Sequence, residues 1–197
     1  MAFLKKLGRA WPRRAGAWCL VLLPLLGWSV PSATRLRGTE AELRATYVYK
    51  FALFTRWPAA AFESANSPMV VAVIGNDPIV PELEKLAAAM TVNERRFKLV
   101  LAESGADAPE CHILYVAGSE KGRVPELLEQ VKGKPVLTVS DLEPWCRLGG
   151  CIRFARAERR VSLLFNPKAA AAQGLRISPE LLAIGKIRET EKNVEPK

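Results

Sequence analysis

The sequence predicts an α/β fold, a single layered domain in which helices flank a mixed, mostly parallel sheet that ends in a C-terminal antiparallel hairpin. Continuous apolar runs of strand length alternate with helical segments, which favours parallel pairing at the centre of the sheet. Two later segments instead alternate with period two, which is typical of a hairpin. The 197 residues, 49% of them hydrophobic, are sufficient for one such domain. We expect it to span residues 40–188 and a flexible tail to span 189–197.

The N-terminal residues predict export. Residues 1–14 contain five basic side chains and no acidic one, and residues 15–26 form an apolar run too short to span a bilayer comfortably. Val30 and Ser32 satisfy the small-residue rule for cleavage after Ser32. Residues 1–32 are therefore predicted to be a secretory signal peptide, which implies an exported mature protein. An uncleaved membrane anchor is the alternative.

The net charge excludes one class of partner. The full chain carries +9, but removal of residues 1–32 leaves 24 basic and 20 acidic residues and a net charge of +4. The remaining lysines and arginines are scattered rather than arranged in a stripe. We therefore expect no nucleic-acid binding.

The first helix is expected over residues 40–56. Its apolar side chains recur at three- and four-residue steps: Leu43, Tyr47, Phe51 and Phe54. Thr39 can cap its start, and Trp57-Pro58 ends it.

The centre of the chain alternates between the two element types. Strands are expected over residues 68–74, 96–101, 111–117 and 136–139, and helices over 81–90 and 124–131. The hairpin follows, with strands over 152–154 and 161–165. Asn166-Pro167 opens a short helix that Gly174 ends, and Ser178-Pro179-Glu180 caps a final helix.

Three cysteines remain after export, and the compartments that exported proteins reach permit disulfides. Cys146 and Cys151 flank a four-residue segment that can close on itself, so a disulfide is one interpretation. A metal site is the other, although two thiols without a nearby histidine make a poor ligand set. Cys111 lies in an apolar strand and is expected to behave as a small hydrophobic residue.

The chain lacks a recognisable catalytic group. Its single histidine, His112, lies in a buried strand, where it alternates with Cys111 and therefore points to the opposite face. There is no phosphate loop, nucleophile elbow or metal-spaced cluster. We therefore expect neither an enzyme nor a bound cofactor or metal.

Polar residues follow three of the strands. In open α/β sheets, ligands bind beyond the carboxyl ends of the strands. A small ligand there would meet Asn76, Asp77, Ser119, Ser140 and Asp141. The same residue types are common in turns and helix caps, which is the competing explanation.

An ordered series of motifs resembles the YfiR-like family of periplasmic proteins. The opening segment 42–51 closing on Trp57-Pro58 is similar to the family's first helix, and residues 73–78 to its first strand and loop. Residues 111–116, 136–141, Gly149-Gly150 and 174–178 follow in the family's order. Each motif is weak alone, but their combined order is specific.

The resemblance implies a dimeric, non-enzymatic repressor that binds the periplasmic sensor region of an inner-membrane diguanylate cyclase. Repression would lower cyclic di-GMP and biofilm formation, and an outer-membrane lipoprotein can sequester such a repressor. The family's disulfide carries over to Cys146 and Cys151. We expect the partner to contact the terminal hairpin through Ile152, Phe154 and Leu164. A periplasmic small-solute-binding or sensor module that uses the strand-end loops is the alternative.

Overall fold

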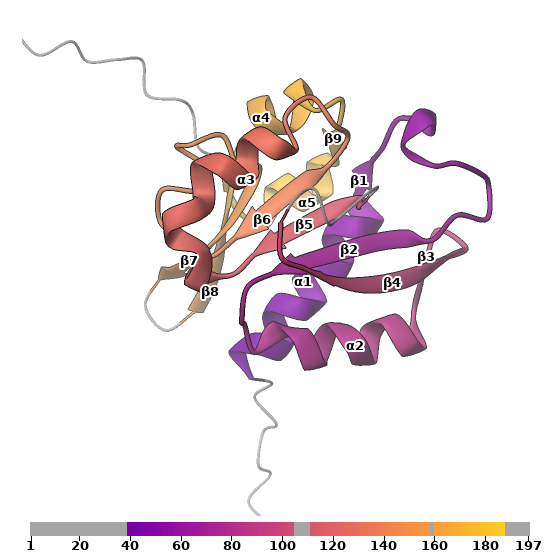
Figure 1. Ribbon diagram of the computed structural model, residues 1–197, viewed down its shortest axis with the longest axis horizontal. Coiled ribbons are helices and arrows are strands. Elements are labelled where there is room, and N and C mark those ends of the chain that lie inside the picture. Colours follow the sequence, from indigo (N-terminus) through magenta and orange to yellow (C-terminus); the bar gives the residue numbers. More distant parts are fainter. Residues whose placement is uncertain (1–38, 105–110, 158–159, 188–197) are drawn as a thin grey trace, which may run out of the picture. The chain divides into compact units, whose positions relative to one another are not determined.

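The computed structural model describes residues 39–104, 111–157 and 160–187. The predicted signal peptide, residues 1–32, and the predicted tail, residues 189–197, lie outside the described residues. Together, the three described ranges form the α/β domain shown in Figure 1.

One mixed sheet organises the domain. Its strands are ordered β10-β8-β7-β6-β5-β2-β4-β3. Their bounds are Met69–Ile74 (β2), Thr91–Val92 (β3), Arg95–Ala102 (β4), Ile113–Val116 (β5), Leu137–Ser140 (β6), Ile152–Ala157 (β7), Arg160–Phe165 (β8) and Lys186–Ile187 (β10). The neighbours from β4 to β7 pair in parallel, whereas β7 and β8 form the antiparallel hairpin. The predicted fold class is confirmed.

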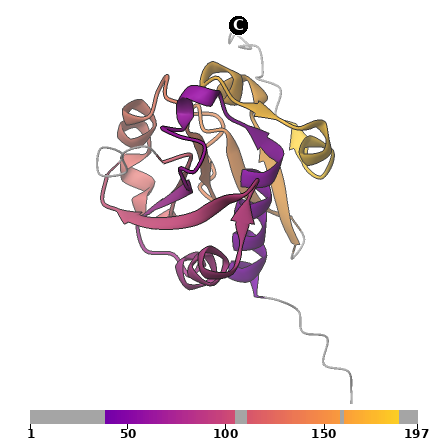
Figure 2. The same cartoon turned by 90° about the vertical axis from the view of Figure 1, so that its right-hand side faces the viewer.

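Helices cover both faces of this sheet. Helices α1 (Glu40–Phe54), α2 (Ile79–Ala89), α4 (Pro167–Ala172) and α5 (Pro179–Ala183) contribute buried side chains to one hydrophobic cluster, which we call the α1-side core. Helix α3 (Val124–Gln130) and the 142–146 loop contribute to a second cluster, the α3-side core. Figure 2 shows α1 and α3 on opposite sides of the sheet. Strands buried on both faces account for the continuous apolar runs in the sequence.

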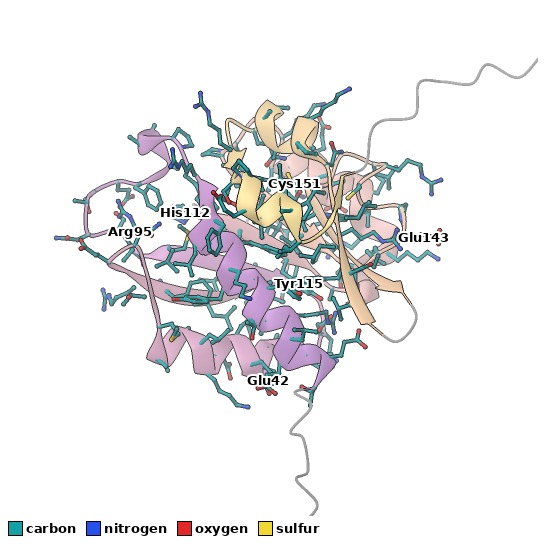
Figure 3. The ribbon with its side chains drawn as sticks, turned by 180° about the vertical axis from the view of Figure 1, so that it is seen from behind. Glu42, Arg95, His112, Tyr115, Glu143 and Cys151 are labelled. Atoms are coloured by element: carbon teal, nitrogen blue, oxygen red, sulfur yellow. The ribbon has the colours of Figure 1, made fainter. Side chains whose placement is uncertain are left out.

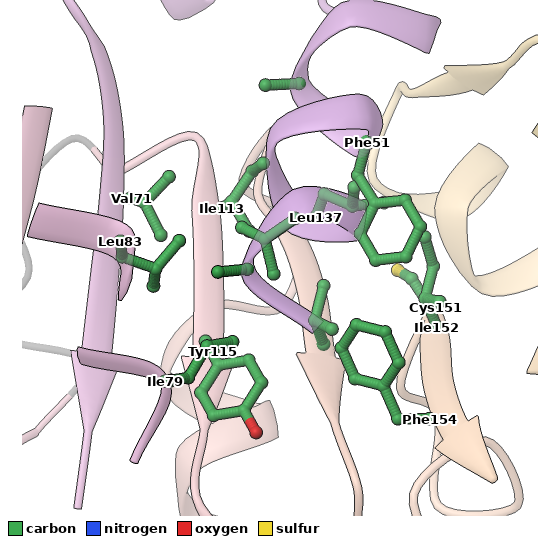
Figure 4. Close-up of a cluster of buried hydrophobic side chains, with 14 of the residues drawn as sticks. Phe51, Val71, Ile79, Leu83, Ile113, Tyr115, Leu137, Cys151, Ile152 and Phe154 are labelled. Carbon is green, nitrogen blue, oxygen red and sulfur yellow. The ribbon is translucent and has the colours of Figure 1, made fainter. Parts of the chain in front are cut away.

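Aromatic side chains fill much of the α1-side core. Phe51 of α1 is fully buried and lies 5.7 Å, centroid to centroid, from the ring of Phe154 and 6.4 Å from that of Phe165. Figure 4 shows Phe51 beside Ile152 and Phe154, with Val71, Ile113 and Leu137 from the central strands nearby. Helix α1 is thereby fixed across the middle of the sheet.

The structure also contains short strands that the sequence did not predict. The first helix ends at Phe54, and Thr55–Arg56 (β1) pairs with Arg176–Ile177 (β9) in a separate two-stranded ribbon. Asn93 and Glu94, both with positive φ, connect β3 to β4 in a two-residue turn. The 3-10 helices η1 (Ala59–Ala61) and η2 (Gly118–Arg123) precede β2 and α3.

Candidate functional site

A buried ion-pair cluster lies at the carboxyl ends of β2, β5 and β6. Arg44 of α1 donates to both carboxylate oxygens of Asp77, over 3.3 and 3.2 Å, and to Asp141 Oδ2 over 3.2 Å. It also donates to the hydroxyl of Tyr115, which lies 2.7 Å away and itself donates to Asp77 Oδ2. One guanidinium therefore joins α1 to three neighbouring strand ends.

Local structure explains how these side chains meet. Arg44 lies on the same side of α1 as Val48 and Phe51, which are both fully buried, so the helix carries its guanidinium toward the sheet. Asp77 lies two residues before α2, and its Oδ1 accepts a hydrogen bond from the amide of Ile79, the first residue of that helix. Figure 3 shows Tyr115 beneath α1. The cluster thus combines one helix face with the ends of parallel strands.

Arg44 retains its charge although it is buried. Burial by itself would lower the pKa of Arg44, but attraction to Tyr115, Asp77, Asp141 and Glu40 outweighs it, so this pKa is raised. Burial raises the pKa of Tyr115, which therefore remains a neutral hydrogen-bond donor. Arg44 is 6% exposed, so its ion pairs are weakly screened by solvent. Removing either sign of charge would leave the other sign desolvated.

These residues occupy the position where doubly wound sheets usually bind ligands. The order β4-β2-β5-β6-β7 reverses direction at β2 and β5, and ligands typically bind in the crevice outside such a reversal. Here the loop after β2 is joined to the loop after β5, because the amide of Asn76 donates to Ser119 Oγ over 3.2 Å. Gly75, at φ +90°, lies so close to Ser119 that an added Cβ would clash with Oγ. The chain's own side chains therefore fill this crevice.

The structure brings four of the five predicted small-ligand residues together, in two pairs. Arg44 bridges Asp77 and Asp141. Ser140 points inward instead: its Oγ donates to the carbonyl of Val116 over 2.7 Å and accepts from the amide of Leu142. Asn76 and Ser119 hold the two loops together, as described above. Ligand binding by these five residues stays a prediction.

A shallow cavity lies beside this cluster. Its volume is about 610 Å³, and its walls come from the 75–78 loop, the first turn of α2 and the ends of β2 and β4. Leu101, which is 62% exposed, forms part of the rim. The lining is mainly apolar, and the carboxylate of Asp77 is already engaged by Arg44.

The sequence reasoning missed Arg44 and Tyr115. A signal for Arg44 was present, because a charged residue at a core-facing position of an amphipathic helix requires a buried partner. Tyr115 likewise placed a hydroxyl in an otherwise aliphatic strand. The identity of their partners depended on strand order, which is a long-range property.

Comparison with known proteins identifies the family. A profile described as YfiR/HmsC-like matches residues 41–186, which is most of the chain. The chain belongs to the YfiR/HmsC-like family. This membership confirms the resemblance and, at the level of the family, supports a periplasmic regulator of diguanylate cyclase activity. A search of curated proteins found no match.

A solved structure supports the fold of this YfiR/HmsC-like chain. The crystal structure of a conserved domain protein from Vibrio cholerae O1 biovar eltor str. N16961 has a TM-score of 0.53 and 11% sequence identity. The match covers 76% of this chain and 60% of the Vibrio chain, so this chain spans less than two thirds of that protein's length. At this identity the likeness shows the fold alone.

The terminal hairpin of this YfiR/HmsC-like chain requires a correction. Ile152 and Phe154, which we expected to contact a partner, are 0% and 3% exposed and belong to the α1-side core. Because side chains alternate along β7, Ile152 and Phe154 both point toward α1 rather than toward solvent. Leu164 is half-buried and packs on the α3-side core, with its carbonyl 3.6 Å from Cys146 Sγ. Of the three, only Leu164 is more than marginally exposed.

The cysteines of the 146–151 segment lie on different sides of the sheet. Cys146 packs in the α3-side core and Cys151 in the α1-side core, and the described residues contain no disulfide between them. Burial raises the pKa of the Cys151 thiol and raises that of Cys111 to about 11, so these thiols are unreactive in the folded chain. The disulfide stays a prediction.

His112 has a structural environment, as the sequence suggested. Its Nδ1 accepts from the amide of Val70 over 3.1 Å, and its Nε2 lies 3.0 Å from the carbonyl of Ala61. Its ring stacks on Phe62 with the centroids 4.3 Å apart. Burial lowers its pKa to about 4, so it is neutral near pH 7. His112 therefore anchors the segment that precedes β2.

The described residues contain neither a metal-binding cluster nor a membrane-spanning helix. They include no group of three or more histidine, cysteine, aspartate or glutamate side chains arranged to hold a metal ion. Within the same ranges, no helix has the length and apolar character needed to cross a membrane.

Proposed function

We propose that this chain is a periplasmic repressor that binds the sensor region of an inner-membrane diguanylate cyclase. Binding would lower cyclic di-GMP and biofilm formation. The observation that carries the proposal is the family match over residues 41–186. We also propose, from the predicted signal peptide and the resemblance, that the mature chain is a homodimer that an outer-membrane lipoprotein can sequester.

The crevice at the strand ends supports a binding role over small-molecule catalysis. The position that would receive a substrate holds the guanidinium of Arg44, which is bound by Asp77, Tyr115 and Asp141. A protein that acts through its surface needs no such opening. The surface of the domain is therefore where a partner would bind.

A gene deletion tests the proposal. Deleting the gene in its own host should raise cyclic di-GMP and biofilm, and the full chain should restore both. A chain lacking residues 2–32 serves as the matched control, because it should fail to reach the periplasm and fail to complement. Unchanged or lower cyclic di-GMP after deletion would overturn the repressor role.

Binding of a small solute is the second candidate function. The cavity of about 610 Å³ beside Asn76 and Asp77 favours it. A ligand there should raise the melting temperature of the wild-type chain, and Asn76→Ala, which changes a lining side chain outside the Arg44 cluster, should reduce the increase. Absence of any such shift across a library of periplasmic solutes would exclude this candidate.

A further inference from the structure

The ribbon formed by β1 and β9 places two arginines directly opposite each other. Arg56 pairs in register with Arg176, and Thr55 pairs with Ile177. Directly opposed residues of an antiparallel pair lie on the same face of the ribbon, with Cβ atoms about 5 Å apart. Arg56 and Arg176 are both exposed, whereas Thr55 is buried and Ile177 half-buried. The two guanidinium groups therefore leave the same outer face.

This arrangement is unfavourable for the isolated chain. Like charges directly opposite each other destabilise an antiparallel pair. Among the described side chains, neither arginine has a carboxylate within ion-pair distance. Glu180, at the start of α5, is near enough to Arg56 for the arginine to contribute to lowering the glutamate pKa, but the backbone and Ser178 contribute more. Only Arg56 of the pair is therefore shown to lie near this acid, which is already engaged by the backbone and Ser178.

The ribbon is held rigidly beneath these side chains. The amide of Ser178 donates to the carbonyl of Phe54 over 2.9 Å, which extends the pairing by one residue. Trp57, directly after β1, donates from Nε1 to the carbonyl of His112. An arginine pair on a fixed backbone loses less freedom on binding than one on a mobile loop. The site is therefore preorganised for an anion.

Phe54 gives the site an apolar neighbour. It immediately precedes the ribbon and is 41% exposed. Phe54 is two residues from Arg56 in the chain, and exposed aromatic and arginine side chains are enriched in protein interfaces. A free phosphate would gain nothing comparable from the ring. These observations favour a protein partner.

We propose that Arg56 and Arg176 together bind a carboxylate of the protein partner, with Phe54 packing against the adjoining apolar surface. The planar guanidinium forks suit a carboxylate, and the incoming negative charge would relieve the repulsion between them. This assignment rests on the proposed function, because the partner is the periplasmic domain of the diguanylate cyclase. It adds a recognition site that the terminal hairpin does not supply.

The test measures the affinity of the mature chain for the purified periplasmic domain of that cyclase. Arg56→Ala with Arg176→Ala should weaken binding by about tenfold or more at low salt and reduce its salt dependence. Arg96→Ala is the matched control, since Arg96 is also an exposed strand arginine but lies opposite Thr91. Arg56→Lys with Arg176→Lys should recover the salt dependence but only part of the affinity.

The outcomes separate this inference from the proposed function. If the wild-type chain binds and the double alanine variant binds equally well, the arginine site is overturned while the function stands. If the wild-type chain does not bind the domain, the repressor function fails and the site loses its partner. Binding to phosphatidylglycerol vesicles that depends on both arginines, without binding to the domain, would overturn the assignment to a protein carboxylate.

A stability measurement guards against misfolding. Because the pair is repulsive in the free chain, Arg176→Ala alone should melt no lower than the wild type. A clear decrease in melting temperature would instead assign Arg176 a structural role and overturn the inference.

Discussion

A single side chain, Arg44, connects α1 to the sheet. Its partners Asp77 and Asp141 are 33 and 97 residues away in the sequence. Such a buried cluster is a weak contributor to net stability, because desolvation offsets much of the attraction. Its geometry ties α1 to three strand ends at once.

Loss of the Arg44 guanidinium should therefore destabilise the domain. We expect Arg44→Met to lower the free energy of unfolding by about 3 kcal/mol, because Asp77 and Asp141 lose their counter-charge. Urea denaturation measures the change. Lys50→Met, an exposed position of the same helix, is the control and should change stability by less than about 0.5 kcal/mol. Adding Asp77→Asn to Arg44→Met should recover part of the loss, and failure to do so would contradict the electrostatic explanation.

His112 makes stability depend on pH. Its pKa is about 4 in the folded chain and about 6.5 when unfolded, so between these values the unfolded chain binds a proton that the folded chain does not. The free energy of unfolding should thus fall as the pH falls from about 6.5 to 4, by up to about 3 kcal/mol, and this contribution should be constant below pH 4.

The measurement is urea denaturation across that pH range. The chain has one histidine, so His112→Gln removes every histidine contribution at once. The difference between the wild-type and variant pH profiles isolates His112 from the carboxylates. Parallel profiles for the two proteins would show that His112 titrates normally in the folded state.

At the scale of the elements, the turn between β3 and β4 carries local strain. Asn93 and Glu94 have φ values of +48° and +69°. Asparagine tolerates this conformation, whereas glutamate is disfavoured there and glycine is preferred. Turn chemistry of this kind is hard to infer without the characteristic Asn-Gly pair.

Glu94→Gly should therefore stabilise the domain. We expect the free energy of unfolding to rise by about 0.5–1 kcal/mol, because glycine adopts positive φ without a Cβ clash. Chemical denaturation measures the gain, and Glu84→Gly within α2 is a control expected to destabilise by about 1 kcal/mol. A loss of stability in Glu94→Gly would indicate that the glutamate side chain has a role in the turn.

Several element boundaries were predictable because their signals are local. Thr39, Asn166 and Ser178 all accept hydrogen bonds from the first turns of α1, α4 and α5, as the sequence indicated. The short strands β1, β9 and β10 were not predictable. Two residues carry no periodicity, and each strand exists only because a distant segment pairs with it.

At the scale of the whole molecule, the two cores separate the cysteines that the resemblance pairs. If the predicted disulfide forms after export, the denatured, non-reduced mature chain should contain one titratable thiol, that of Cys111. Thiol titration with and without reductant measures this number. Cys146→Ser is the control, because it should leave the Cys151 thiol without a disulfide partner and therefore titratable. Three thiols in the wild-type chain would show that the arrangement in the structure persists in the oxidising compartment.

The sequence by itself determined the layered α/β class, the C-terminal hairpin, the order of the main elements and the family. These follow from hydrophobic periodicity, capping residues and ordered motifs, all of which act between near neighbours in the chain. Only the tertiary structure decided that Arg44 fills the strand-end crevice, that Ile152 and Phe154 are buried, and that Arg56 lies opposite Arg176. Each of these depends on which distant segments pack together, because burial and charge pairing are set by strand order and register rather than by local sequence.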